Sequence, residues 1–140
     1  AQKQVHAALR FGWWGLALFA CAGLGLEALH GFKVGVYLDV GQETRRLMWT
    51  LAHAHGTLLS LMHIAWGASL AALGPGDTKR RGRVSALLRL ATVLLPGGFA
   101  LGGVWIHGGD PGIAAALLVP PGALCLLAAL GLAAKETNAP

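Results

Sequence analysis

The sequence predicts an all-α integral membrane protein in which residues 1–140 form one transmembrane domain, a four-helix bundle. Hydrophobic residues make up 55% of the chain and charged residues only 12%. The apolar residues fall into four long runs, each near or above the ~20 residues that cross a hydrocarbon core ~30 Å thick. Short connections between the runs leave no room for a soluble domain. The expected spans are residues 8–30, 45–73, 84–106 and 113–134.

The first run is expected to be a true span. It is too long for the apolar region of a secretory signal, and no small-residue cleavage site followed by a soluble chain comes after it. In the segment 31–46, apolar residues alternate with Gly and polar residues, which is typical of a chain lying along a membrane surface. No helix breaker separates Glu43 from the second run. The second helix is therefore expected to begin above the hydrocarbon.

The third and fourth runs are separated by only six residues, 107–112, with Gly and Asp-Pro sequences typical of a turn. The two spans should therefore be antiparallel neighbours. Pro96 and the pair Pro120-Pro121 fall near the middle of these spans and are expected to bend them, because proline lacks a backbone donor.

The basic residues predict the orientation. Of the eleven lysines and arginines, eight lie on the side of the termini and of the connection between the second and third runs, and three lie on the opposite side. This distribution favours cytoplasmic termini in a bacterial inner membrane. The net charge of +5 then reflects topology. The expected partners are membrane lipids, and no nucleic acid is expected. The eight are Lys3, Arg10, Lys79, Arg80, Arg81, Arg83, Arg89 and Lys135, and the three are Lys33, Arg45 and Arg46.

Small residues recur within the spans and predict close helix packing, because lipid supplies little hydrophobic force between helices. The pattern L-G-x-x-x-x-H-G ends both the first and the third span, at residues 24–31 and 101–108. It suggests a parallel two-helix repeat, with His30 and His107 at one level. The glycines singled out are Gly12, Gly15, Gly23, Gly25, Gly97, Gly98 and Gly102.

Ionisable residues at membrane depth are costly, so their grouping indicates a binding site. Glu27 and His30 are three residues apart and share a helix face, an arrangement that supplies metal ligands in helical bundles. His53, His55 and His107 are expected near the same outer level, with His63 deeper. The predicted metal ligands are Glu27, His30, His55, His107 and His63, and the predicted haem ligands are His53, His55, His30 and His107.

The pair His53 and His55 cannot easily bind one ion together, because residues two apart differ by about 200° around a helix. One imidazole should face the bundle interior, and the other a bulky cofactor or another subunit. The protein is therefore expected to be a homo-oligomer or a subunit of a membrane complex. The alternative is that each imidazole forms a hydrogen bond with a neighbouring helix.

The segment 51–62, LAHAHGTLLSLM, resembles the haem-ligand helices of subunit I of the haem–copper oxidases and nitric oxide reductases. The resemblance implies that His55 is an axial haem ligand and that His53 is a second, oppositely directed one. His30 or His107 would then be axial partners. The chain has far fewer spans than that family and no His–Tyr copper-site motif, so oxygen reduction is not expected.

The whole chain is also similar to small, functionally uncharacterised four-span bacterial membrane proteins, a likeness that implies topology alone. We expect a redox-linked membrane protein that binds haem b or a transition metal (Cu, Zn or Fe). Two alternatives are a non-catalytic subunit of a larger complex and a small transporter or proton pathway. Ser60 and Ser69 lack a suitably spaced base and acid, so no soluble catalytic constellation is predicted.

Overall fold

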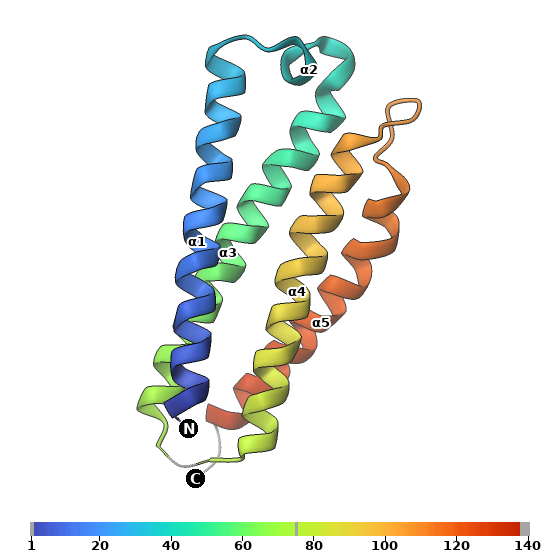
Figure 1. Cartoon of the computed structure of the whole chain (residues 1–140). Helices are drawn as coiled ribbons and strands as arrows, with labels where there is room; N and C mark the ends of the chain where they lie inside the picture. Colours follow the sequence, from blue (N-terminus) through green and yellow to red (C-terminus); the bar gives the residue numbers. More distant parts are fainter. Residues whose placement is uncertain (1, 75, 138–140) are drawn as a thin grey trace.

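The computed structural model describes residues 2–74 and 76–137, and within these ranges the regular structure is helical, with no strand. The four long helices run alternately up and down (Figure 1). The predicted all-α class is confirmed. The long helices are α1 (Gln2–Gly31), α3 (Glu43–Ala72), α4 (Thr78–Val104) and α5 (Ile113–Thr137), and α1 and α3 are joined through α2 (Gly35–Leu38) and a 3₁₀ turn, η1 (Val40–Gln42).

Three of these helices, α1, α4 and α5, are long and apolar enough to cross a membrane. α3 has 30 residues but does not meet the same hydropathy criterion. Its first turn is charged, and histidine, threonine and serine interrupt its apolar sequence. The helices begin before the expected spans: α1 begins at residue 2 and α4 at residue 78, six residues ahead of the spans expected from residues 8 and 84.

The early start of α4 has a local cause. The carboxylate of Asp77 accepts hydrogen bonds from the backbone N–H groups of Lys79 (2.9 Å) and Arg80 (3.1 Å), which caps α4 ahead of its apolar part. The prolines Pro96, Pro120 and Pro121 lie inside α4 and α5, which both continue past them.

The long helices lie in a row in the order α1, α3, α4, α5 (Figure 1). α3 packs against α1 on one side and α4 on the other, and α5 packs against α4. All four helices come together at the end where α1 begins and α5 ends. We call this end the basic end, because most of the predicted cytoplasmic basic residues lie there. An apolar core joins all four helices at this end: Val5, Ala8, Trp66, Leu70, Val84, Leu88 and Ala129.

Glycines allow the helices to approach closely, as predicted. A Cβ on Gly12 would lie 2.8 Å from the carbonyl oxygen of Ser60 on α3. A Cβ on Gly102 would lie 2.7 Å from the Cβ of Ala115 on α5. Gly25 and Gly97 differ, because a side chain at either position would enter open space. The glycines therefore mark the α1–α3 and α4–α5 contacts, with these two exceptions.

Arg45, in the first turn of α3, ties together the end opposite the basic end, which we call the outer end after its expected orientation. Its Nε donates to the carbonyl of Gly103 (2.9 Å), and its Nη1 to the carbonyl of Val36 (3.1 Å). The Nη2 donates to the carbonyl of Val104 (3.4 Å). A cation that binds the last carbonyls of a helix also complements its dipole. Arg45 therefore caps α4 and links it to the segment between α1 and α3.

A buried ion pair ties the basic end. The Nε of Arg81 donates to Oε1 of Glu136 at 2.6 Å, and the two side chains are 4% and 2% exposed. Arg80 reaches the second carboxylate oxygen at 3.3 Å, and Nη1 of Arg81 donates to the carbonyl of Gly74 (2.7 Å). The pair thus joins the end of α5 to the start of α4 and to the preceding connection.

Candidate cofactor site

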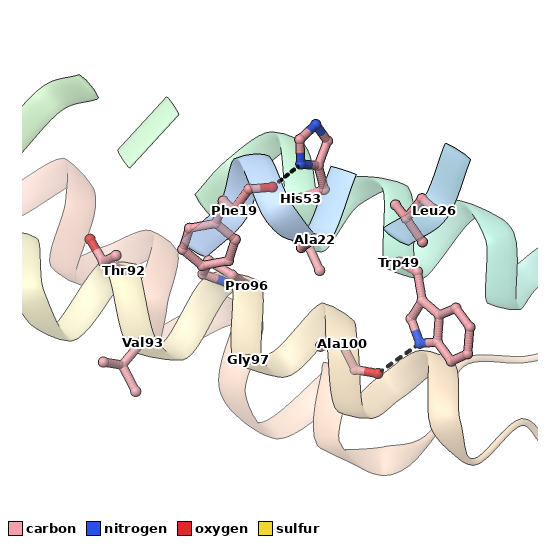
Figure 2. Close-up of a pocket in the computed structure, with 11 residues that line it drawn as sticks. Phe19, Ala22, Leu26, Trp49, His53, Thr92, Val93, Pro96, Gly97 and Ala100 are labelled. Atoms are coloured by element: carbon pink, nitrogen blue, oxygen red, sulfur yellow. Dashed lines mark hydrogen bonds between the residues drawn. The ribbon is translucent and has the colours of Figure 1, made fainter. Parts of the chain in front are cut away.

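His53 is half-buried on α3, and its imidazole lies against α1 (Figure 2). Its Nδ1 is 2.8 Å from the carbonyl oxygen of Phe19. A carbonyl oxygen only accepts, so Nδ1 must carry the hydrogen and donate it. The neutral ring therefore keeps its lone pair on Nε2, and no described residue forms a hydrogen bond with that atom. A backbone carbonyl that fixes the tautomer in this way is typical of metal-ligating histidines.

Gly23 makes this hydrogen bond possible. A helical carbonyl points toward the residue four positions later, so the side chain of residue 23 would stand beside the oxygen of Phe19. A Cβ there would lie 2.5 Å from Cε1 of His53. The missing side chain of Gly23 therefore creates the notch that the imidazole occupies.

His53 also lines a recess of about 650 Å³ between α1 and α3, near the outer end. Glu27 and His30 line the same recess from one face of α1, and both are exposed. The spacing of Glu27 and His30 predicted their shared face. The structure thus brings three of the predicted site residues to one recess. Tyr37 and Thr50 complete its polar lining, and small and apolar residues of α1 complete the rest.

His55 faces the other way, as helical geometry predicts. Its Nδ1 donates to the carbonyl of Leu51 at 2.9 Å, which also fixes the tautomer with the lone pair on Nε2. The ring centroid lies 4.9 Å from that of Phe99 on α4. The two histidines therefore serve different neighbours, His53 on α1 and His55 on α4.

His63 is fully buried at the α3–α4 contact. Its Nε2 is 3.2 Å from Oγ1 of Thr92, and this hydroxyl donates its own hydrogen to the carbonyl of Leu88. Nε2 must therefore donate, and the buried Nδ1 has no hydrogen-bond partner among the described residues. The ring packs 4.5 Å from that of Phe11 on α1. His63 is thus enclosed by the helix packing, away from the recess.

The predicted metal group of Glu27, His30, His55, His107 and His63 is not assembled. Within residues 2–74 and 76–137, no three His, Cys, Asp or Glu side chains lie close enough to hold a metal ion. His107 is exposed in the α4–α5 turn, where its backbone pairs with Asp110. His55 points to the opposite side of α3 from the recess. The prediction compared only expected depths along the helices, and the row of helices separates these residues laterally.

Sequence reasoning missed three groups that organise these histidines: the carbonyl of Phe19, the notch at Gly23 and the hydroxyl of Thr92. Gly23 carries a signal, since it belongs to the predicted close-packing glycines. The other two carry none, because every residue has a carbonyl and a threonine in an apolar helix is common.

No protein-family model, curated protein or solved structure matches the chain. The function of the site is therefore inferred from its residues.

Proposed function

We propose that the protein is a redox-linked, four-span protein of a bacterial inner membrane that binds a b-type haem through His53. The termini are cytoplasmic in this proposal, which is supported by the concentration of arginine and lysine at the basic end. α3 is the fourth span. It lies between α1 and α4, and neighbouring helices can supply partners for its polar side chains.

The tautomer of His53 is the observation that carries the proposal. Its Nδ1–H is held by Phe19, so its Nε2 lone pair is available, and the ring borders a recess that is open to a ligand. An unpaired imidazole nitrogen at membrane depth is costly. A bound group at Nε2 would remove that cost.

Haem fits this donor set better than a chelated ion does. A chelated ion needs three or more protein ligands, and the described residues offer no such group. Haem brings its own four porphyrin nitrogens, so a single protein imidazole is enough to hold the iron. When bound, haem supplies one-electron redox chemistry. His30 lines the same recess and would be the second residue to hold the haem, with Glu27 three residues before it on the same face of α1.

The two alternative functions differ in their support. The proton pathway receives little, since His55 and His63, the two histidines it would use, are eight residues, or about 12 Å, apart along α3. Nδ1 of His63 also lacks a hydrogen-bond partner among the described residues, so no polar chain continues from it. A non-catalytic subunit of a larger complex requires no cofactor. An absorption spectrum with iron analysis separates such a subunit from a haem protein. The oligomeric state of the purified protein tests the expected homo-oligomer.

An absorption spectrum with iron analysis of the full chain, purified in detergent from haem-replete cells, tests the proposal. The expected result is a Soret band with about one haem per chain in the wild type, lost in His53→Ala. His6→Ala is the matched control, because His6 is exposed at the basic end of α1. Loss of the Soret band in His55→Ala but not in His53→Ala would instead identify His55, on the α4 side of α3, as the haem ligand. A colourless, iron-free wild type would refute the proposal and favour the structural subunit.

A further inference from the structure

Two arginines that form no ion pair with a described acidic residue line one recess between α1 and α4. This recess, of about 560 Å³, lies toward the basic end and includes Arg10 and Arg89 together with Phe11 and Trp14. Both arginines are exposed, and no acidic residue lines the recess. The ion pairs found among the described residues involve Arg46, Arg80 and Arg81 instead. The recess therefore concentrates positive charge that no acidic residue of the described ranges neutralises.

The depth of these arginines makes the absence of a partner significant. Arg10 lies two residues into the expected span 8–30 and Arg89 five residues into the span 84–106, about 3 and 8 Å inside the edge of each span. An arginine within or beside the hydrocarbon is normally paired, and it marks a functional site by default. The guanidinium of Arg89 lies 5.7 Å from the ring centre of Phe11, which turns it toward α1 and the recess. Both cations thus face one place where an anion would be stabilised.

An apolar groove continues from this charged recess toward the outer end. Phe19, Thr92 and Val93 line both the charged recess and a second one of about 410 Å³. Figure 2 shows that Ala22 and Leu26 of α1 border the second recess on one side, and that the turn of α4 with Gly97 borders it on the other. The combined groove therefore has two cations at one end and an apolar channel leading away from them along the helices.

We propose that this groove binds an anionic phospholipid of the inner leaflet, with the phosphate between Arg10 and Arg89 and an acyl chain along α1 and α4. Charge complementarity selects an anionic headgroup, and the long apolar channel selects a lipid over a free anion. His53 of α3 also lines the apolar part of the groove, although its imidazole points away from α4 (Figure 2). The groove and the haem site therefore share this residue and Leu26, and the groove differs in having Arg10 and Arg89 at its charged end.

Native mass spectrometry of the full chain tests the proposal, after equilibration with equal amounts of phosphatidylglycerol and phosphatidylcholine of the same acyl chains. Each arginine near an anionic headgroup contributes about a fivefold preference, so the wild type should favour phosphatidylglycerol roughly 25-fold. The double variant Arg10→Gln/Arg89→Gln should retain the two lipids about equally. Arg10→Lys/Arg89→Lys should keep most of the preference, and Arg83→Gln, an exposed arginine outside the groove, should keep all of it.

A second variant tests the apolar channel. A side chain at Gly97 meets nothing within 4 Å, so Gly97→Leu should fold normally and fill the channel. Bound phosphatidylglycerol should fall several-fold in this variant, whereas Gly25→Leu, at an equally open position on α1, should retain it. A wild type without preference, a preference that survives in the double glutamine variant, or full retention by Gly97→Leu would overturn the proposal. Circular dichroism of each variant checks that the helices are intact.

Discussion

Replacement of Glu136 by alanine should destabilise the protein by about 3–5 kcal/mol, the usual cost of leaving one member of a buried ion pair without its partner. The upper half of that range is expected here, because Arg81 is only 4% exposed and loses a hydrogen bond of 2.6 Å. The unpaired Arg81 side chain cannot easily turn into water, because Gly76 packs directly against it. A Cβ on Gly76 would overlap both Arg81 and Glu136. Arg80 loses its longer contact of 3.3 Å as well.

Reversible unfolding in mixed detergent and SDS micelles, followed by circular dichroism, measures this free energy. Glu43→Gln is the matched control, because its ion pair with Arg46 is 3.8 Å long and the carboxylate side chain is 74% exposed. Such a surface pair contributes about 0–1 kcal/mol. The double variant Arg81→Met/Glu136→Leu should cost less than Glu136→Ala, because no unpaired charge is left buried. A Glu136→Ala protein within about 1 kcal/mol of the wild type would refute the reasoning.

Three further predictions concern other parts of the molecule. Gly23→Ala should destabilise the protein by about 1–3 kcal/mol in the same unfolding assay, because its Cβ would displace the ring of His53. Gly25→Ala, at an open position, should be neutral or slightly stabilising. Equal effects of the two substitutions on stability would show that His53 does not occupy a notch at Gly23. Arg45→Gln should cost about 1.5–3 kcal/mol and speed amide exchange in the last turn of α4, because the cation that binds the α4 carbonyls of Gly103 and Val104, and the carbonyl of Val36 in α2, is lost. Unchanged exchange would rule out the cap. The backbone N–H of Arg80, together with that of Lys79 and the charges of Arg80 and Arg83, lowers the pKa of Asp77 below its ordinary 3.8. The ionised carboxylate therefore stabilises the fold above about pH 4, and this contribution should be lost as the pH falls below 3.8. The difference in unfolding free energy between wild type and Asp77→Asn, which keeps a capping oxygen, should shrink over that range.

Part of the candidate site follows from helical geometry alone. The opposed directions of His53 and His55 and the shared face of Glu27 and His30 depend only on the angle between residues of one helix, and both are found in the structure. The grouping of these residues with His107 required knowledge of which helices are neighbours. Depth in the membrane is one coordinate, and it does not say where a residue lies in the plane.

The helical class, the apolar character of α1, α4 and α5, and the positions of most close-packing glycines can be predicted from the chain, because they depend on composition and on the local periodicity of one helix. The row of helices closed at the basic end, the contact of Phe19 with His53 and the pairing of Arg81 with Glu136 arise only when the helices pack together. These contacts join residues 34 and 55 positions apart. Partners so distant are selected by how whole helix surfaces pack, and no local pattern in the chain encodes that choice.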